Sequence, residues 1–371
     1  MNKESLDMLI ENSTPKNDHF KMAAEFGPQR RSFMIWPERQ DNWRNGGKPA
    51  QEAFTKLAEL ISHFQPVTML VNQDQYLNAK QRLNGIAQVI EMSSDDAWAK
   101  DVLPIYVHKA HQVRGVNFQF NAWGGLIDGL YFPWDKDNEL AVKVCDLTYT
   151  DYYSSDIILE GCSVLTDGQG TIITTEVVLL AEDRNPNMSK HFMETVLQQY
   201  LGAEKVIWLK HGYFLDETGG DVDNMVNFVR PGELVLTWTD DRSDPLFAAC
   251  HEAFAILKDA TDAQGRSFKI HKMLVPAKDQ QRLSKEESQG IDLVKGLMPR
   301  EIGQRLTATY VNYLMVNDAI IFPLFNDPQD QIAKQQLQKL FPERQIIGFP
   351  VREILIGGGG LHTIVNSLPK Y

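Results

Sequence analysis

Short apolar segments rich in β-branched residues alternate with amphipathic helical patterns along the whole of this 371-residue chain. Between them lie segments such as 48–64, whose apolar residues recur at the i, i+3, i+4 spacing of a helix. This alternation predicts an α/β fold. The apolar segments are SFMIWP (32–37), VTMLV (67–71), TIITTEVVLL (171–180), KVIWL (205–209), ELVLTW (233–238), AIIFPLF (319–325) and QIIGFP (345–350).

Three further helices carry end signals. Ser189 and Gly202 bracket one helical pattern as cap and stop. Asp244 with Pro245, and Asp327 with Pro328, begin two others. No Pro-, Ser- or Gly-rich linker interrupts this order, so we expect one domain over residues 1–371, with residues 1–20 as an N-terminal extension.

Composition excludes several classes of protein. Hydrophobic residues make up 43% and charged residues 23% of the chain, which is ordinary for a globular protein with a large core. The net charge is −12, with no basic stripe, so we expect small cationic ligands and no nucleic acid. No apolar run is long enough to span a membrane and no signal peptide is visible, so we expect a cytoplasmic protein. The three cysteines, Cys145, Cys162 and Cys250, have neither disulfide nor metal spacing.

Four stretches place acidic or reactive side chains beside glycine or tryptophan. Each taken alone is more typical of a turn, since Asp and Gly favour turns. Trp98 alone suits a core, His362 a hydrogen-bonded structural role, and Cys162 a small buried hydrophobe. Glu160 differs, because an acid that ends an apolar strand is costly to bury without a cationic partner. The stretches are SSDDAWAKDVLP (93–104), ILEGCSVLTDGQG (158–170), DETGGDVDN (216–224) and GGGGLHT (357–363).

Taken together, these stretches resemble the agmatine deiminase family, within the guanidine-modifying superfamily of penteins. The resemblance also covers residues 13–54, FNAWGGLIDGLYFPWD (120–135) and MPREIG (298–303). It implies five ββαβ units around a pseudo-fivefold axis, a central active site and a homo-oligomer. It also implies hydrolysis of agmatine to N-carbamoylputrescine and ammonia without metal or cofactor.

The family reaction uses a cysteine thiolate to attack the guanidinium carbon, a histidine to transfer protons and carboxylates to hold the substrate. The resemblance places the substrate-binding acids at Asp101 and Glu160, with Trp98, Gly359 and His362 as further binding residues. It places at Asp223 the catalytic aspartate that helps to hold the substrate and the histidine. The position of the nucleophilic cysteine is Thr363, and that of the catalytic histidine is Asp221. Lys100, Cys162 and Leu165 are smaller departures from the family motifs.

These departures weaken the expected chemistry. A threonine hydroxyl needs a general base, and an ordinary aspartate is a weak one. Loss of a nucleophile alone costs on the order of a million-fold in the best-studied triad. Cys162 is a candidate replacement thiol. Against it, a strand residue two steps from Glu160 lies about 7 Å away, and the sequence shows no histidine partner.

Three hypotheses follow. The chain is an active agmatine deiminase with Cys162 or Thr363 as nucleophile, a catalytically silent relative that binds a cation such as agmatine or a polyamine, or a partner subunit of an active paralogue. Asp221 would bring a fourth carboxylate to Asp101, Glu160 and Asp223, and a polyamine, agmatine or a divalent cation would compensate such clustered acids. Trp98 could cover the alkyl chain or the cationic head of such a ligand. The sequence favours the silent cation-binding relative.

Overall fold

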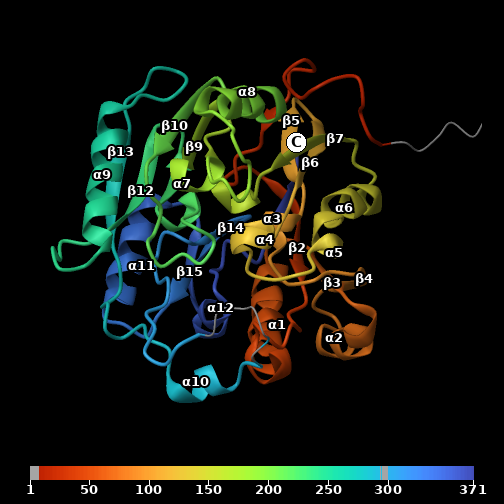
Figure 1. The fold of residues 1–371 in the computed structure, drawn as a ribbon, viewed down its shortest axis with the longest axis vertical. Helices are drawn as coiled ribbons and strands as arrows, with labels where there is room; N and C mark the ends of the chain where they lie inside the picture. The colour runs from red at the N-terminus through yellow and green to blue at the C-terminus, as the bar shows by residue number, and fades with distance from the viewer. Residues whose placement is uncertain (1–7, 293, 295–299) are drawn as a thin grey trace, which may run out of the picture.

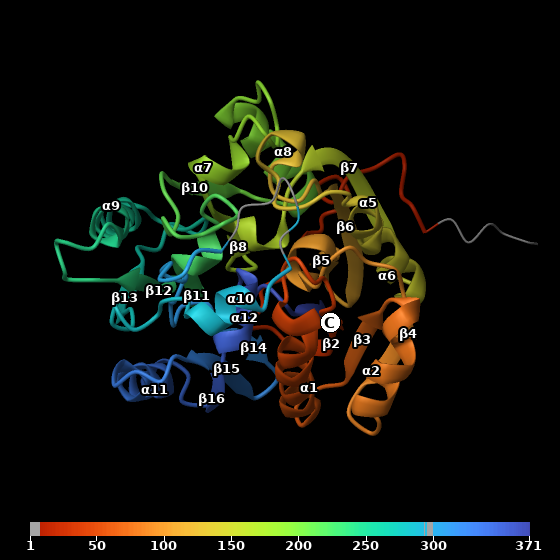
Figure 2. The same ribbon diagram turned by 60° about the horizontal axis from the view of Figure 1, so that its bottom comes forward.

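The computed structural model describes residues 8–292, 294 and 300–371. Residues 298 and 299 of the MPREIG stretch therefore lie outside the described part of the chain. Five small sheets surround a central axis, and five helices lie outside them (Figures 1 and 2). Within the described ranges, no helix has the length and apolarity to cross a lipid bilayer.

The five sheets repeat one pattern, in which an antiparallel strand pair is extended by a parallel strand after a helical crossover. In sheet order, the strands are β1 (Lys21–Met22), β5 (Ile105–Lys109), β6 (Gln112–Gln119) and β7 (Tyr152–Ile158); β10 (Lys205–Leu209), β9 (Thr171–Thr175) and β8 (Val164–Thr166); β11 (Val226–Arg230), β12 (Glu233–Trp238) and β13 (Lys269–Leu274); β14 (Leu314–Val316), β15 (Ala319–Leu324) and β16 (Gln345–Pro350); and β17 (Asn366–Pro369), β2 (Gln29–Ile35), β3 (Val67–Val71) and β4 (Gln88–Glu91).

The crossover helices of the five sheets lie at the periphery of the molecule (Figure 1). They are α1 (Lys48–Ser62), α6 (Leu140–Thr148), α8 (Lys190–Leu201), α9 (Leu246–Asp259) and α11 (Gln329–Leu340). The shorter elements are η1 (Arg44–Gly47), η2 (Gln73–Gln75), α2 (Tyr76–Arg82), α3 (Ala99–Val102), α4 (Gly125–Asp128), α5 (Asp135–Asn138), η3 (Gly161–Ser163), α7 (Glu176–Leu179), η4 (Val222–Asn224), α10 (Lys285–Gln289) and α12 (Arg352–Gly357).

The fifth sheet joins the two ends of the described chain. β17 pairs antiparallel with β2, and β2 pairs parallel with β3 across α1. This sheet therefore has the same pattern as the other four, with its first strand supplied by the last element of the chain. The alternating α/β organisation predicted from the sequence is confirmed.

The helix signals mostly agree with the structure. Ser189 accepts a hydrogen bond from the Phe192 N–H at the start of α8, and Gly202 ends that helix in a left-handed conformation. The carboxylates of Asp244 and Asp327 accept from the Leu246 and Gln329 N–H groups that begin α9 and α11. One expectation was wrong: the apolar run 171–180 is not one strand, because β9 ends at Thr175 and α7 begins at Glu176.

Candidate functional site

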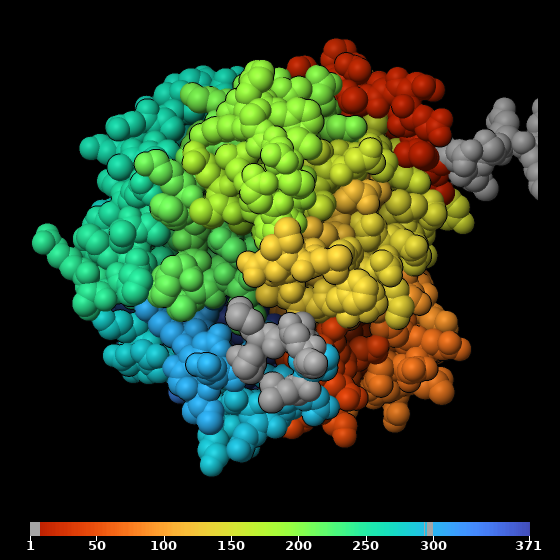
Figure 3. Space-filling view, in the orientation of Figure 1, coloured from red at the N-terminus to blue at the C-terminus, as the bar shows by residue number. Residues whose placement is uncertain are grey.

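A cavity of about 520 Å³ opens near the centre of the ring. Segments from the N-terminal, middle and C-terminal parts of the chain converge around the centre of the face in Figure 3. The cavity wall is strongly acidic, and its cationic side chains are Arg39 and Arg300. The acidic residues of the wall are Asp41, Asp96, Asp128, Asp216, Glu217, Asp221, Asp223 and Glu301.

The glycine run 357–360 begins at the last residue of α12 and continues into the loop before β17. Its lack of side chains leaves room for large neighbouring side chains. A Cβ atom on Gly357 would lie 2.3 Å from a ring carbon of Trp43, and one on Gly359 would lie 2.3 Å from a ring carbon of Trp98. The two indoles stack with centroids 5.1 Å apart, and Trp98 lines the cavity. The glycines therefore allow an aromatic wall to form beside the site.

Thr363 lies at the end of this run and lines the cavity. Its hydroxyl accepts a hydrogen bond from the Gly360 N–H at 3.3 Å, and its carbonyl accepts one from the Lys100 N–H at 2.9 Å. In the part of the chain that the structure describes, no imidazole or carboxylate is hydrogen-bonded to this hydroxyl. Position 363 therefore holds a hydroxyl group that is not hydrogen-bonded to a general base.

Four buried carboxylates gather near Thr363, and each keeps one oxygen without a hydrogen-bond partner. These are Asp101, Glu160, Asp221 and Asp223, with unpartnered Oδ2, Oε2, Oδ1 and Oδ1 atoms. Asp221 and Asp223 line the cavity, whereas Asp101 and Glu160 lie outside its lining. Unsatisfied buried oxygens are costly, so this group is suited to receive a donor or a cation.

The electrostatic surroundings raise the pKa values of Asp221 and Asp101 in this group, and that of the neighbouring Asp216. Burial, followed by repulsion from Asp216, Asp101 and Glu160, raises the pKa of Asp221 well above its ordinary value. Burial raises the pKa of Asp101 to about 7, although the N–H of Cys162 donates to its Oδ1 at 2.9 Å. Burial, followed by repulsion from Asp223, raises the pKa of Asp216 to about 6.

Glu160 has the cationic partner that its position in the sequence required. The Nε of Arg184 donates to its Oε1 at 2.7 Å, and both side chains are almost fully buried. Arg184 also donates to the carbonyl of Thr218. One oxygen of Glu160 is therefore engaged within the protein, and only its Oε2 is without a hydrogen-bond partner.

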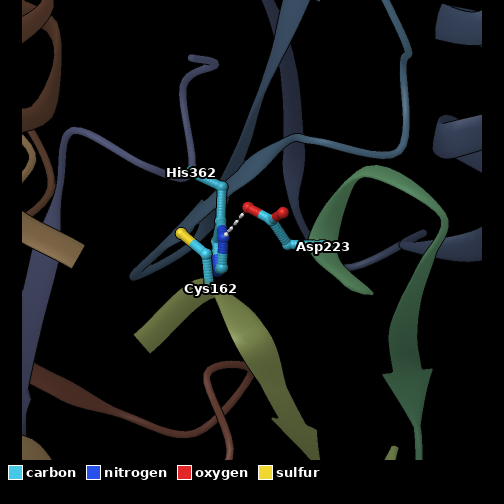
Figure 4. A group of neighbouring side chains, drawn as sticks. All are labelled: Cys162, Asp223 and His362. Carbon is cyan, nitrogen blue, oxygen red and sulfur yellow. Dashed lines mark hydrogen bonds and ion pairs between the residues drawn. The ribbon is translucent and has the colours of Figure 1, made fainter. Parts of the chain in front are cut away.

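Cys162 lies in the turn η3, not on a strand, so the argument from strand spacing does not apply. Its thiol, the imidazole of His362 and the carboxylate of Asp223 offer atoms that all lie within 4.8 Å of one another. Figure 4 shows the His362 ring between the thiol and the carboxylate. The histidine neighbour that the sequence did not reveal is therefore His362.

Cys162 is nevertheless a poor nucleophile in this structure. Burial, followed by the negative charges of Asp101, Asp223 and Asp221, raises the pKa of its thiol well above the ordinary range. The neutral thiol therefore dominates at neutral pH, and only the thiolate is strongly nucleophilic.

His362 is held between two carboxylates. Its Nδ1 bonds Asp223 Oδ2 at 2.9 Å, and its Nε2 bonds Glu25 Oε2 at 2.8 Å. Burial opposes the charged ring, but the attraction of Glu25 and the hydrogen bonds to Asp223 and Glu25 together outweigh it, and the pKa of His362 rises to about 9. Instead of lining the large cavity, His362 lies with Glu25 and Lys100 on a separate cavity of about 50 Å³.

Sequence reasoning missed Glu25 and Arg184 as members of the site. The Lys100 ammonium is bound to Glu25, so the departure at position 100 keeps a cation beside this carboxylate. Glu25 lies within the resembling stretch 13–54, which was its only sequence signal. Arg184 follows α7 in a loop with no local pattern to mark it.

Comparisons with known proteins agree with this architecture. A family model described as Porphyromonas-type peptidyl-arginine deiminase matches residues 21–369. A protein of Listeria monocytogenes whose name places it among the agmatine deiminases is 54% identical over 357 residues, which cover 96% of each chain. The agmatine deiminase of Pseudomonas aeruginosa (strain LESB58) is 47% identical over 360 residues, covering 96% of this chain and 97% of the other.

The solved structure of the Enterococcus faecalis agmatine deiminase superposes with a TM-score of 0.94 at 46% identity, covering 97% of this chain and 99% of that one. The chain belongs to the agmatine deiminase family. Its ring of five sheets is the pentein α/β propeller, and both the family and the fold expected from the sequence are confirmed. The roles of Thr363, Asp221 and the other site residues of this chain stay predictions.

Proposed function

We propose that this agmatine deiminase relative binds a small organic cation in its central cavity and does not carry out covalent deimination. The observation that carries the proposal is the pair of unpartnered, buried oxygens on Asp221 and Asp223, which line the cavity, with unpartnered oxygens of Asp101 and Glu160 behind its lining. A guanidinium or ammonium group supplies several N–H donors and a positive charge, which satisfies oxygens of this kind. Agmatine and related polyamines are the proposed ligands.

The shape of the cavity supports an elongated cation. Trp98 and Trp123 line the wall, and their indoles suit the alkyl chain of such a ligand. Asp96 accepts hydrogen bonds from the indole N–H groups of Trp43 at 2.6 Å and Trp98 at 2.8 Å. The aromatic wall is therefore held in place before any ligand arrives.

The loss of chemistry is argued from two positions. Thr363 stands where the resemblance expects a nucleophilic cysteine, and its hydroxyl has no base beside it in the described structure. Asp221 stands where the resemblance expects the histidine, and its raised pKa keeps it protonated. A protonated carboxyl cannot accept a proton from an alcohol, so Asp221 cannot serve as the general base that the Thr363 hydroxyl needs.

The test combines binding with turnover. Purified chain is treated with a chelator, and agmatine, putrescine and spermidine are added while the melting temperature and the heat of binding are recorded. Butylguanidinium and the neutral butylurea form a matched pair of probes. We expect the cations to bind and to raise the melting temperature, butylurea to do neither, and agmatine to release no ammonia.

Two variants sharpen the test. Asp221→Asn replaces a carboxyl group that a bound cation would ionise by a neutral amide of similar shape, and we expect weaker cation binding. Asp128→Asn removes an exposed charge from the cavity wall and should change the affinity little, because exposed charges are screened by solvent. Indifference of the protein to every cation would refute the proposal.

A relocated thiol is the second candidate, because His362 lies near Cys162. Ammonia release from agmatine that disappears in Cys162→Ala would establish it and would overturn the silent-relative proposal. A role as partner subunit of an active paralogue, a homo-oligomeric state and a cytoplasmic location stay predictions. The size of the native particle and its co-purification with an active paralogue would test the first two.

A further inference from the structure

Three potential metal ligands meet at the edge of the central cavity. Cys162 comes from η3, Asp223 from η4, and His362 from the loop between α12 and β17 (Figure 4). Each residue is about 1% exposed, and one donor atom of each lies within 4.8 Å of the other two. Three separate sheets of the ring thus deliver a sulfur, a nitrogen and an oxygen to one point.

The local backbone is built to allow this meeting. A Cβ atom on Gly161 would lie 2.0 Å from the carbonyl oxygen of Lys100, so only glycine lets η3 approach α3 so closely. That approach brings the Cys162 N–H to the Asp101 carboxylate. The Cys162 side chain is thereby fixed beside the carboxylate cluster.

Carboxylate oxygens without a hydrogen-bond partner accompany the three potential metal ligands. Asp223 Oδ1 and Asp101 Oδ2 are buried and have no partner within the described structure. Nδ1 of His362 and Oδ2 of Asp223 are 2.9 Å apart. Donor atoms about 2.1 Å from one zinc ion lie roughly 3.0–3.4 Å from each other, so a small opening of this contact admits an ion.

The far side of His362 has the support that a metal-bound imidazole requires. Its Nε2–H donates to Glu25 at 2.8 Å, and Glu25 is itself bound by the Lys100 ammonium. A carboxylate on the second ring nitrogen fixes the tautomer and orientation that leave the first nitrogen to bind a metal. Glu25 therefore acts as a positioning residue in this arrangement.

We propose that Cys162, Asp223 and His362 form a binding site for a divalent transition-metal ion, with zinc as the best match. One thiolate, one imidazole and one carboxylate suit a borderline-soft ion better than Ca²⁺ or Mg²⁺, which prefer oxygen. Cys162 and Asp223 also line the large cavity, which provides an entry path and a fourth, open coordination position.

Binding replaces protons by the metal. The proton on Sγ and the proton on Nδ1 leave to solvent, and one divalent ion takes their place among the same three side chains. The inference shares Asp223 with the proposed binding of organic cations, but it depends on Cys162 and His362 and is tested without any amine present.

The experiment uses the full chain without an affinity tag. The protein is stripped with a chelator, dialysed against Zn²⁺, and its bound zinc is measured by elemental analysis. Co²⁺ is then titrated, and the thiolate-to-cobalt charge-transfer band is recorded in the near ultraviolet. We expect one metal ion per chain and a clear charge-transfer band.

Three variants decide the outcome. Cys162→Ser should lose the band and weaken binding at least about 10-fold, and Glu25→Gln should weaken it about 10- to 100-fold with the band retained. Cys250→Ser is the matched control, since Cys250 is a buried free cysteine in α9 that packs in a hydrophobic core cluster without Cys162. It should behave as the unmodified chain.

Failure to retain zinc, or a cobalt spectrum and affinity unchanged by Cys162→Ser, would overturn the site. If Cys162→Ser does not fold, Asp223→Asn makes the same decision by its metal affinity. The organic-cation measurements are made in chelator, so either proposal can fail while the other stands.

Discussion

At the scale of single residues, Arg184 has the most constrained role. It is 4% exposed, and it neutralises Glu160, which is fully buried. Its own pKa is raised, because the attraction of Glu160 and Asp221 outweighs the cost of its burial. A buried charge pair of this kind contributes little in total, yet each partner depends heavily on the other.

We therefore predict that Arg184→Gln lowers the free energy of unfolding by about 3–5 kcal/mol, because Glu160 is left charged and unpaired. Urea unfolding followed by tryptophan fluorescence measures this. The double variant Arg184→Gln/Glu160→Gln should recover most of the loss. Arg282→Gln breaks an exposed ion pair with Asp279 and should cost no more than about 1 kcal/mol. Equal costs for the two single variants would contradict the prediction.

Two carboxyl groups of the cavity wall set a pH dependence. Burial raises the pKa of both Asp96 and Asp216 to about 6. Each is therefore mostly protonated at pH 5 and mostly ionised at pH 7.5, and the ionised forms attract a cation. We predict that agmatine binds several-fold more weakly at pH 5.0 than at pH 7.5, as measured by calorimetry in chelator.

Asp216→Asn should reduce the affinity at pH 7.5 and flatten the profile. Asp128→Asn should leave the profile as it is, because that carboxylate is exposed. An affinity for agmatine that stays constant from pH 5.0 to 7.5 would show that these carboxyl groups do not face the bound cation.

The residues of the candidate site that lie in sequence motifs could be predicted, whereas the contacts that only the fold creates could not. Asp221, Asp223, Trp98, Gly359 and Thr363 lie in motifs, and the structure brings them to one cavity. The nearness of Cys162 to His362 is a contact between residues 200 positions apart, which no local pattern reveals. Arg184 could not be predicted either, because a single arginine in a loop does not indicate which carboxylate it will contact.

At the scale of elements, the segment between α12 and β17 shows how a backbone makes room for a site. Trp98 lies against Gly359 so closely that any side chain there would displace the indole. The sequence showed that this run lets something approach the backbone, but it could not identify Trp43 and Trp98 as the partners. The boundary between β9 and α7 could not be predicted either, because a continuous apolar run does not distinguish a strand from a buried helix that follows it.

We predict that Gly359→Ala lowers the free energy of unfolding by about 1–3 kcal/mol and also weakens cation binding, since Trp98 must move. Thermal unfolding and calorimetry with agmatine measure the two effects. Gly85→Ala is the control, because a Cβ atom there meets nothing within 4 Å although φ is +78°. It should cost roughly 1 kcal/mol through backbone strain alone and leave binding unchanged.

Normal agmatine affinity in Gly359→Ala would mean that Trp98 does not contribute to the ligand wall. A loss of affinity in Gly85→Ala as well would mean that binding reports only on general stability.

At the scale of the whole molecule, the chain retains the ring of its family, and the loss of the family's chemistry is our proposal. The chain superposes on an agmatine deiminase over almost its entire length. The scaffold that would present a nucleophile at position 363 and a base at position 221 is therefore in place. The prediction of one domain with an extension over residues 1–20 stays a prediction, although Ile10 bonds to β7 and Phe20 is buried.

We predict that the double variant Thr363→Cys/Asp221→His releases ammonia from agmatine, whereas each single variant does not. A thiol needs the imidazole to become a nucleophile, and the imidazole has no substrate to act on without the thiol. The assay is ammonia release by purified protein, with agmatine binding as a check on the cavity. A folded double variant that binds agmatine without turnover would show that the remaining departures also block the reaction.

The pairing of β17 with β2 has a consequence for how the chain is made. β2 leaves the ribosome early, and its partner emerges only after nearly the whole ring has been translated. Until then β2 lacks its antiparallel partner. Thr363 and His362 reach the site with the same final segment. The fifth sheet is thus closed by the C-terminal strand, and the cavity wall at Thr363 is completed only when the last segment has been translated.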